Sequence, residues 1–494
     1  MNLQTFSAQV TALDNIVWGL PLIVAILATG ILLTIMLRVR HAFNLRRAFY
    51  FMLHNEKGAK GDVTAFGALC TALSATIGTG NIVGVATAIA SGGPGALFWM
   101  EVAAFFGMAT KYAEGLLAVK YRETTPDGHM LGGPFYYIEK GLGKGWKWLA
   151  LLFAAFGVLA GIMGIGTITQ VNGITNAVQT AFDKIGPMTT WTILGTEHSL
   201  PCIVAGVLVT LAAGLVIIGG VKRIANVASV VVPYMAIFYV LCCLVLICVN
   251  ATAIPKAVIL IVKGAFNPQA VTGGVVGTMF IAVQKGVARG IFSNEAGLGS
   301  APIAAAAAQT NEPVRQGLVC MLGTFIDTIV ICSMTGLAIV VTGAWDPALK
   351  LEGGNVTIEA FQRGLPFLGD VFPAFLLTLS LLFFAFTTIL GWNYYSEKCL
   401  EYIVGPTRKL PVYVFRVLYI LAVFVGPYLT VSCVWDIADI FNGLMAFPNL
   451  VALVLLSPVV YKSTKSFISS LWVNAWTFEH IEAPGYDLAS KFPR

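Results

Sequence analysis

Small, polar and helix-breaking residues interrupt an otherwise apolar segment, between about residues 66 and 90, in the run from Ser74 to Asn81. A Gly inside a helix costs about 1 kcal/mol relative to Ala, and an unpaired amide in hydrocarbon costs several kcal/mol. A membrane helix therefore breaks only where its backbone lines a cavity or binds a ligand. Amides after such a break would bind a carboxylate and carbonyls before it would bind a cation, which favours a transporter site.

Close helix packing is the alternative for this run, because Gly80 and Gly84 form a GxxxG pair. For an isolated motif, packing ranks above binding. A second apolar segment, however, carries Gly286 and Gly290 in a corresponding position. Paired interruptions in the two halves of a chain point to a transporter site, and packing gives no reason for the correspondence. We therefore expect a helix break at both positions and favour binding over packing.

The composition is that of a membrane protein. The chain has 494 residues, of which 57% are hydrophobic and 11% charged, and its mean hydropathy is +0.82. Soluble domains carry about 25% charged residues, so we expect a polytopic integral membrane protein in a lipid bilayer. The net charge of +6 is explained by cytoplasmic loops and requires no nucleic-acid partner. The nine cysteines form no CxxC pair, and no cofactor is expected besides a coupling ion.

About eleven apolar segments are long enough to cross a bilayer. Basic clusters follow the first, third and last of them, which places the N-terminus outside and the C-terminus in the cytoplasm. The expected spans are 16–37, 66–90, 96–119, 149–178, 201–219, 228–249, 270–292, 318–342, 371–395, 411–432 and 435–461.

The spans divide into two equal sets once the first is set aside. The remaining ten spans divide into two halves of five. Because five is an odd number, the two halves enter the membrane from opposite sides, as an inverted repeat requires. We therefore predict an all-α integral membrane protein with one peripheral N-terminal helix and a five-plus-five inverted repeat whose first helices are broken. The expected parts are the N-terminal region 1–62, the repeats 63–250 and 251–461, and a cytoplasmic tail 462–494.

Three motifs carry a resemblance to a known family. They are GTGNIVGVA at residues 78–86, ARGIFSNEAG at 288–297 and TTILGW at 387–392. Together they resemble the alanine or glycine:cation symporter family, and the similarity covers nearly the whole chain. The resemblance implies a LeuT-type fold, a location in the plasma (inner) membrane of a prokaryote, and import of a small neutral amino acid with sodium and sometimes protons. It also implies that the chain is not an enzyme.

A zwitterionic substrate would need partners for its carboxylate and its ammonium. A half-helix that starts near Gly78 would direct the amides of Thr79, Gly80 and Asn81 at the carboxylate, and the helix dipole adds to the attraction. Carbonyls near Ser74 and Ile77 would face a sodium ion. These assignments follow from the run itself.

Further pocket residues come from other spans. From the sequence alone, Gln170 is equally suited to form a hydrogen bond between helices or to contact a ligand. The resemblance implies that its amide oxygen accepts a hydrogen bond from the substrate ammonium. Val283, Gly286 and Val287 share one helix face and would form a wall. The resemblance implies that this wall contacts substrate through side-chain bulk and backbone carbonyls.

Residues of the ninth span complete the expected site. Thr388 and Trp392 are four residues apart and face the same way. Trp392 would close an apolar side of the pocket and limit the substrate to small side chains, although a Trp in a span also serves core packing or interface anchoring. LeuT-type sodium sites imply that the hydroxyls of Thr387 and Thr388 are sodium ligands.

Several charged residues in or beside the spans have no assigned role: Glu101, Lys285, Asp327, Asp436 and Asp439. Because of them, a proton-coupled amino-acid permease of the same fold stays open, with Lys285 or an acid as the proton carrier. A membrane-embedded enzyme is the third class, but no suitable Ser, His or acid constellation is visible. The preference for alanine or glycine, for the L or D form, and the oligomeric state are left open.

Overall fold

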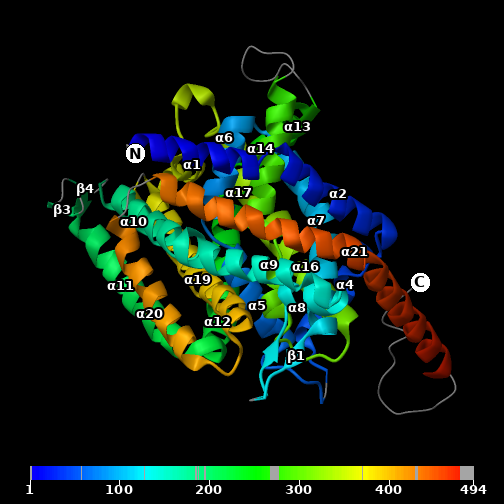
Figure 1. Cartoon of the computed structure of the whole chain (residues 1–494). Coiled ribbons are helices and arrows are strands. Elements are labelled where there is room, and N and C mark those ends of the chain that lie inside the picture. The colour runs from blue at the N-terminus through cyan, green and yellow to red at the C-terminus, as the bar shows by residue number, and fades with distance from the viewer. Residues whose placement is uncertain are drawn as a thin grey trace.

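Helices make up nearly all of the computed structural model (Figure 1). It describes residues 3–478, apart from 57, 127, 184–185, 187–188, 194–195, 267–276, 370 and 429–431. Two short β-hairpins are the sheets of the described part. The fold class expected from the sequence is confirmed.

The first predicted span, 16–37, corresponds to α2 (Leu20–Met36). A further helix, α1 (Leu3–Val17), precedes it across a turn at Trp18 and Gly19. The Trp18 indole donates to the main-chain carbonyl of Asp439, 2.8 Å away, and thereby ties this turn to the last helix. The basic segment that follows forms α3 (Arg40–Phe43) and α4 (Leu45–Leu53).

The second predicted span is broken where the sequence predicted. Its first half is α5 (Ala65–Thr76), which Thr64 caps by accepting from the Gly67 amide. Its second half is a short π-helical turn, η1 (Gly80–Gly84), continued by α6 (Val85–Gly92). The two halves meet at a bend of 55°.

The rest of the first half surrounds this broken helix. A Gly164 with φ 173° and ψ −61° interrupts the span that contains α9 and α10. The elements are α7 (Gly95–Tyr121), β1 (Glu123–Thr124), β2 (Met130–Leu131), α8 (Pro134–Tyr136), η2 (Tyr137–Gly141), η3 (Lys144–Trp146), α9 (Lys147–Ala160), η4 (Gly161–Ile165), α10 (Ile168–Asp183), β3 (Thr190–Ile193), β4 (Thr196–Ser199), α11 (Leu200–Ile218) and α12 (Gly220–Val249).

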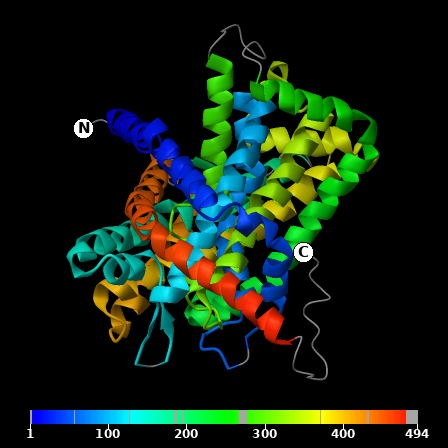
Figure 2. The same cartoon turned by 90° about the vertical axis from the view of Figure 1, so that its right-hand side faces the viewer.

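The second half begins with helices that pack against α7. Figure 2 shows α6, α7 and α14 side by side in the middle of the molecule. The elements are η5 (Ala251–Ala253), α13 (Ile254–Phe266), α14 (Gly277–Asn294), α15 (Ala301–Ala305), α16 (Pro313–Thr324), η6 (Phe325–Cys332), α17 (Ser333–Thr342), η7 (Pro347–Leu349), α18 (Gly354–Gly364), η8 (Pro366–Leu368), α19 (Val371–Val404), α20 (Lys409–Val425), η9 (Gly426–Tyr428) and α21 (Ser432–Phe478).

Within the described residues, nine helices are long and apolar enough to span a membrane, or ten with the bent pair α5–α6. The chain is therefore a multi-pass membrane protein. The segment α14 is not one of the nine, because Gln284, Lys285 and Arg289 lower its hydropathy. The start of its predicted span, at 270–276, lies outside the described residues. The helix α21 continues past the predicted boundary at 461 to Phe478.

The predicted position of the second break is wrong. The helix α14 runs without interruption through Gly286 and Gly290. Both glycines allow a close approach to α7, since a β-carbon on Gly286 would lie 2.2 Å from the Ala96 carbonyl oxygen and one on Gly290 would lie 3.1 Å from Met100. At this pair, packing is the better explanation.

The chain breaks instead after Asn294. Glu295 has a φ of 54°, a left-handed conformation that is uncommon for a residue with a side chain. Gly297 and Gly299 follow with φ of 92° and 82°, and the short helix α15 begins at Ala301. The segment between the predicted spans 270–292 and 318–342 thus contains a buried second break and a short helix.

Candidate functional site

The first break leaves two backbone donors free. The helix α5 ends at Ile77, whose ψ of 93° is not helical. The Gly78 amide donates to Asn81 Oδ1 at 2.9 Å, and the Asn81 amide donates to the Gly78 carbonyl at 3.3 Å. Within the described part of the chain, the amides of Thr79 and Gly80 have no partner. They lie at the N-terminal end of the second half-helix, where the helix dipole is positive and attracts an anion.

Gln170 lies beside this break with one unsatisfied atom. Its side chain is buried, and Nε2 donates to the Ile165 carbonyl at 3.0 Å. Oε1 is buried without a partner among the described residues. A β-carbon on Gly78 would lie 3.7 Å from this oxygen. The kink at Gly164 positions α10 so that a free acceptor meets the break.

Thr388 of α19 approaches the break from another side. Its hydroxyl donates to the carbonyl of Phe384 at 3.0 Å and lies 3.4 Å from the carbonyl oxygen of Ile77. A β-carbon on Gly78 would lie 2.7 Å from this hydroxyl oxygen, so position 78 has no room for a side chain. The structure thus brings Gly78, Gln170 and Thr388 together.

The expected sodium ligands are only partly brought together. The Ile77 carbonyl and the Thr388 hydroxyl meet, as expected. Ser74 faces α19, since a β-carbon on Gly391 would lie 2.7 Å from its hydroxyl oxygen. The Thr387 hydroxyl lies elsewhere: it donates to the Phe384 carbonyl and lies 3.4 Å from the sulfur of Met235 on α12. Uncharged carbonyl and hydroxyl oxygens suit a monovalent cation.

The side chain of Asn81 connects the first break to the second half of the chain. Its Nδ2 donates to Asp327 Oδ1 at 2.7 Å, and its carbonyl accepts from Thr335 at 2.9 Å. Oδ2 of Asp327 accepts from Ser293 and Thr328, both at 2.8 Å. Asp327 therefore joins both broken helices. The sequence indicated only that Asp327 is a charged residue inside a span. Its hydrogen-bond partners follow from the packing of the helices.

The wall expected from α14 is formed by other residues of that helix. A β-carbon on Gly80 would lie 3.4 Å from Cα of Ser293 and 3.5 Å from the ring of Phe292. The part of α14 that packs against α6 and α7 lies nearer its N-terminus and contains Val283, Gly286 and Val287. The structure does not bring these three to the first break, because the helix stays intact up to Asn294.

Trp392 is fully buried and contacts the second break. Its indole Nε1 donates to Glu295 Oε1 at 3.1 Å, and the Ser300 hydroxyl donates to the other carboxylate oxygen. A β-carbon on Gly166 would lie 2.4 Å from Cβ of Trp392. Trp392 therefore packs against the turn before α10 and fixes Glu295 in its unusual conformation.

The free amides of the second break are occupied by a side chain of the protein. Glu114 Oε1 accepts from the amides of Gly297 and Gly299, both at 3.2 Å, and from Asn449 Nδ2 at 2.7 Å. Lys111, one turn earlier on α7, acts electrostatically on this carboxylate. An external carboxylate thus finds free amides at the first break and not at the second.

A profile of the sodium:alanine symporter family matches residues 3–475. The chain belongs to the sodium:alanine symporter family. It is 52% identical to a transporter of Haemophilus influenzae over 97% of this chain and 99% of that protein. It is 45% identical to the sodium/alanine symporter AgcS of Methanococcus maripaludis over 94% of this chain and 97% of that one. This symporter is therefore a transporter and not an enzyme.

A solved structure supports the LeuT-type architecture of the symporter. The crystal structure of MhsT in complex with L-phenylalanine superposes with a TM-score of 0.52 at 13% identity, covering 82% of this chain and 98% of that one. At this identity the likeness concerns the fold alone. The bound ligand of that structure is not evidence for the substrate of this symporter.

Proposed function

We propose that this symporter imports a small neutral amino acid, alanine and/or glycine, together with sodium, and that the substrate binds at the first break. The free amides of Thr79 and Gly80 would receive the carboxylate, as supported by their lack of internal partners. Their charge is that of a helix N-terminus, which attracts an anion without a basic side chain. The name of the Methanococcus relative supports alanine as the first substrate to assay.

The observation that carries the proposal is the unpaired Oε1 of Gln170. A buried acceptor without a partner costs about 1–3 kcal/mol, and a substrate ammonium would relieve this cost. Oε1 faces the same break as the two free amides. The site thus offers complementary partners for both ends of a zwitterion.

Sodium would bind on the other side of the break. The Ile77 carbonyl and the Thr388 hydroxyl are the proposed ligands, and Ser74 lies within the same helix turn. A cation held there would order the end of α5 and thereby complete the amino-acid pocket. One positive charge moving through 100 mV releases about 2.3 kcal/mol, which supports roughly fifty-fold accumulation of substrate.

The proposed arrangement in the membrane follows the charge pattern of the loops. The symporter would reside in the plasma (inner) membrane of a prokaryote, with the N-terminus outside, the C-terminus in the cytoplasm and repeats at 63–250 and 251–461. Alternating access would then expose the site to each side in turn.

The test is uptake by the purified protein in proteoliposomes, with a panel of small amino acids and with or without a sodium gradient. We expect sodium-dependent uptake of alanine or glycine, and a loss of at least about tenfold in Gln170→Ala, since one hydrogen bond to a charged group is worth that factor. Asn176→Ala on the same helix is the control, because its amide bonds Asn172 on a neighbouring face. Equal uptake by both variants would place the ammonium elsewhere.

Coupling to protons is the second candidate, and one observation favours it. Both carboxyl oxygens of Glu101 on α7 are buried without a hydrogen bond, although Ser333 lies close enough to act on them. A buried carboxyl in a membrane span that has no cation partner among the described residues is a candidate proton carrier. In sodium-free proteoliposomes, uptake driven by a pH gradient and lost in Glu101→Gln would support it. Uptake that requires sodium in both proteins would exclude it.

A further inference from the structure

The cytoplasmic ends of the two broken helices meet in a short main-chain junction. Just before α5, the amides of Asp62 and Val63 donate to the Ala307 carbonyl at 2.8 and 3.1 Å. Just after α15, the Gln309 amide donates back to the Val63 carbonyl at 2.8 Å. A β-carbon on Gly61 would lie 2.5 Å from Cα of Gln309, so the two segments are in direct contact.

Arg122 holds this junction from the end of α7. Its Nη1 donates to the carbonyls of Ala306 and Ala308, both at 2.7 Å. Its Nη2 donates to the carbonyls of Lys60, at 2.9 Å, and Thr310, at 2.5 Å. All four acceptors are main-chain oxygens, and they come from both sides of the junction. A planar guanidinium can serve such a set, whereas a lysine ammonium is a single point charge.

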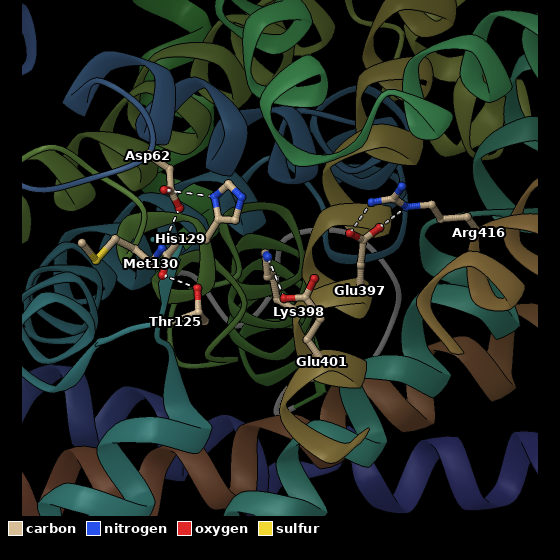
Figure 3. A network of polar contacts seen from close by, with 8 residues as sticks. All are labelled: Asp62, Thr125, His129, Met130, Glu397, Lys398, Glu401 and Arg416. Carbon is tan, nitrogen blue, oxygen red and sulfur yellow. Dashed lines mark hydrogen bonds and ion pairs between the residues drawn. The ribbon is translucent and has the colours of Figure 1, made fainter. Parts of the chain in front are cut away.

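The segment before α5 is also fixed on its other side. Figure 3 shows the Asp62 side chain directed towards His129 and Met130 of the β1–β2 hairpin. Its carboxylate accepts from the Met130 amide at 2.8 Å and lies 3.4 Å from Nδ1 of His129. Asp62 also acts electrostatically on the Arg122 guanidinium, as does Glu56. The junction is therefore clamped between α7 and the hairpin that follows α7.

Behind the junction, α5 and α15 enclose a cavity of about 10 Å³, room for about one water molecule. It reaches from Thr76, next to the first break, past Lys111 to the cytoplasmic half of α16. The facing surfaces of α5 and α15 carry mainly small side chains. The residues that line it are Ala68, Leu69, Ala72, Thr76, Lys111, Asn294, Ala301, Ala305, Cys320 and Gly323. Separation of α5 from α15 would widen this cavity into a path from the break to the cytoplasm.

We propose that Arg122 is the latch of the cytoplasmic gate: it keeps α5 and α15 joined while the site faces outwards, and its bonds to the junction break when substrate is released. Arg122 touches neither substrate nor ion in this proposal and acts as a positioning residue. The inference rests on the proposed alternating access, but it does not depend on which amino acid or cation is carried.

The native Cys320 gives a direct readout of this gate. It lines the cavity and is buried, so a membrane-impermeant maleimide should label it slowly in inside-out vesicles. Removal of the latch should raise the labelling rate about tenfold or more, since each bond to the charged group is worth about that factor. Cys399, buried on α19 against Gly157, is the internal reference because it lies away from the cavity.

We would compare Arg122→Gln and Arg122→Lys with the wild-type protein and with Lys120→Gln. Lys120 is an exposed cation on the last turn of the same helix, and among the described residues its side chain has no hydrogen bond to the junction. We expect faster labelling of Cys320 in both Arg122 variants, unchanged labelling of Cys399, and wild-type behaviour of Lys120→Gln. Arg122→Lys keeps the charge and provides the test if Arg122→Gln fails to fold.

Two outcomes would overturn the proposal. If Cys320 is labelled at the wild-type rate in Arg122→Lys and Arg122→Gln, the junction stays closed without the latch. If Cys399 becomes reactive together with Cys320, Arg122 stabilises the whole fold and not the gate. Failure of alanine uptake in the wild-type protein would contradict the proposed function and leave the labelling result unaffected.

Discussion

The two helix breaks of this symporter both expose backbone amides, but a side chain of the protein binds these amides at only one of them. At the first break, the amides of Thr79 and Gly80 are free and face an unpaired oxygen of Gln170. At the second, the amides of Gly297 and Gly299 already bind the carboxylate of Glu114. An inverted repeat supplies two similar half-helix ends. The neighbouring side chains decide which of them is available to a ligand.

The glycines near the two breaks also have different tasks. Gly78 keeps space for Thr388 at the first break, whereas Gly286 and Gly290 let α14 lie against α7. Of these three glycines, only Gly78 lies at an interruption of its helix. A glycine in a membrane helix thus indicates a binding site when its neighbour is a polar group, and helix packing when its neighbour is the backbone of another helix.

The largest effect is expected from emptying the second break. Glu114→Ala would leave the amides of Gly297 and Gly299 unpaired in the core and remove one of the hydrogen bonds of Asn449, which should reduce the free energy of unfolding by about 3 kcal/mol or more. Thermal unfolding of the purified protein in detergent measures this loss, with the exposed Glu352→Ala as control. A wild-type melting temperature for Glu114→Ala would mean that the second break needs no internal carboxylate.

Filling the space at the first break should abolish transport and leave the fold intact. A β-carbon in Gly78→Ala would lie 2.7 Å from the Thr388 hydroxyl oxygen, and such a displacement at a binding site costs about a hundredfold in rate. Gly84→Ala is a matched control on the same broken helix, because its β-carbon would meet no atom within 4 Å. Similar uptake rates in the two variants would contradict the close approach of α19 to the break.

A smaller effect, unrelated to either break, is expected from His41. Burial lowers the pKa of this residue from 6.5 to about 4. Its neutral form is therefore favoured in the folded state, so stability is complete above about pH 6.5 and falls as the pH approaches 4. The loss at pH 5 should be about 2 kcal/mol relative to pH 7. Melting temperatures of His41→Phe should depend less on pH than those of the wild type or of the exposed His54→Phe.

The smallest effect distinguishes two neighbouring threonines of α19. Thr388→Val removes the hydroxyl that meets the Ile77 carbonyl, and should raise the sodium concentration for half-maximal uptake about tenfold. Thr387→Val removes a hydroxyl on the face towards Met235 and should leave this concentration within about twofold. The reverse order of effects would move the proposed sodium site to the other face of α19.

The sequence predicted the membrane class, the first break and the family of the chain, because each leaves a local signal. Hydropathy marks the spans, and a Gly-Thr-Gly-Asn run in one of them marks the break. It also predicted that Gln170 and Thr388 face the break, by spacing and resemblance, and the structure brings both to Gly78.

The rest depends on contacts between distant segments. Nothing local distinguishes Gly286, which packs on Ala96, from Gly78, which approaches Thr388. The burial of Glu114 against the second break joins residues 183 positions apart in the chain. Likewise, the link from Asp327 to Asn81 and Ser293 exists only after three helices have packed.

Hydrogen exchange of the backbone amides tests the difference between the breaks most directly. Mass spectrometry with peptide fragments that cover the two breaks would compare the purified symporter alone, with sodium, and with sodium and alanine. We expect added protection of the segment with Thr79 and Gly80 when both ligands are present, and no change at Gly297 and Gly299. Protection that appears at the second break, or at neither, would contradict it.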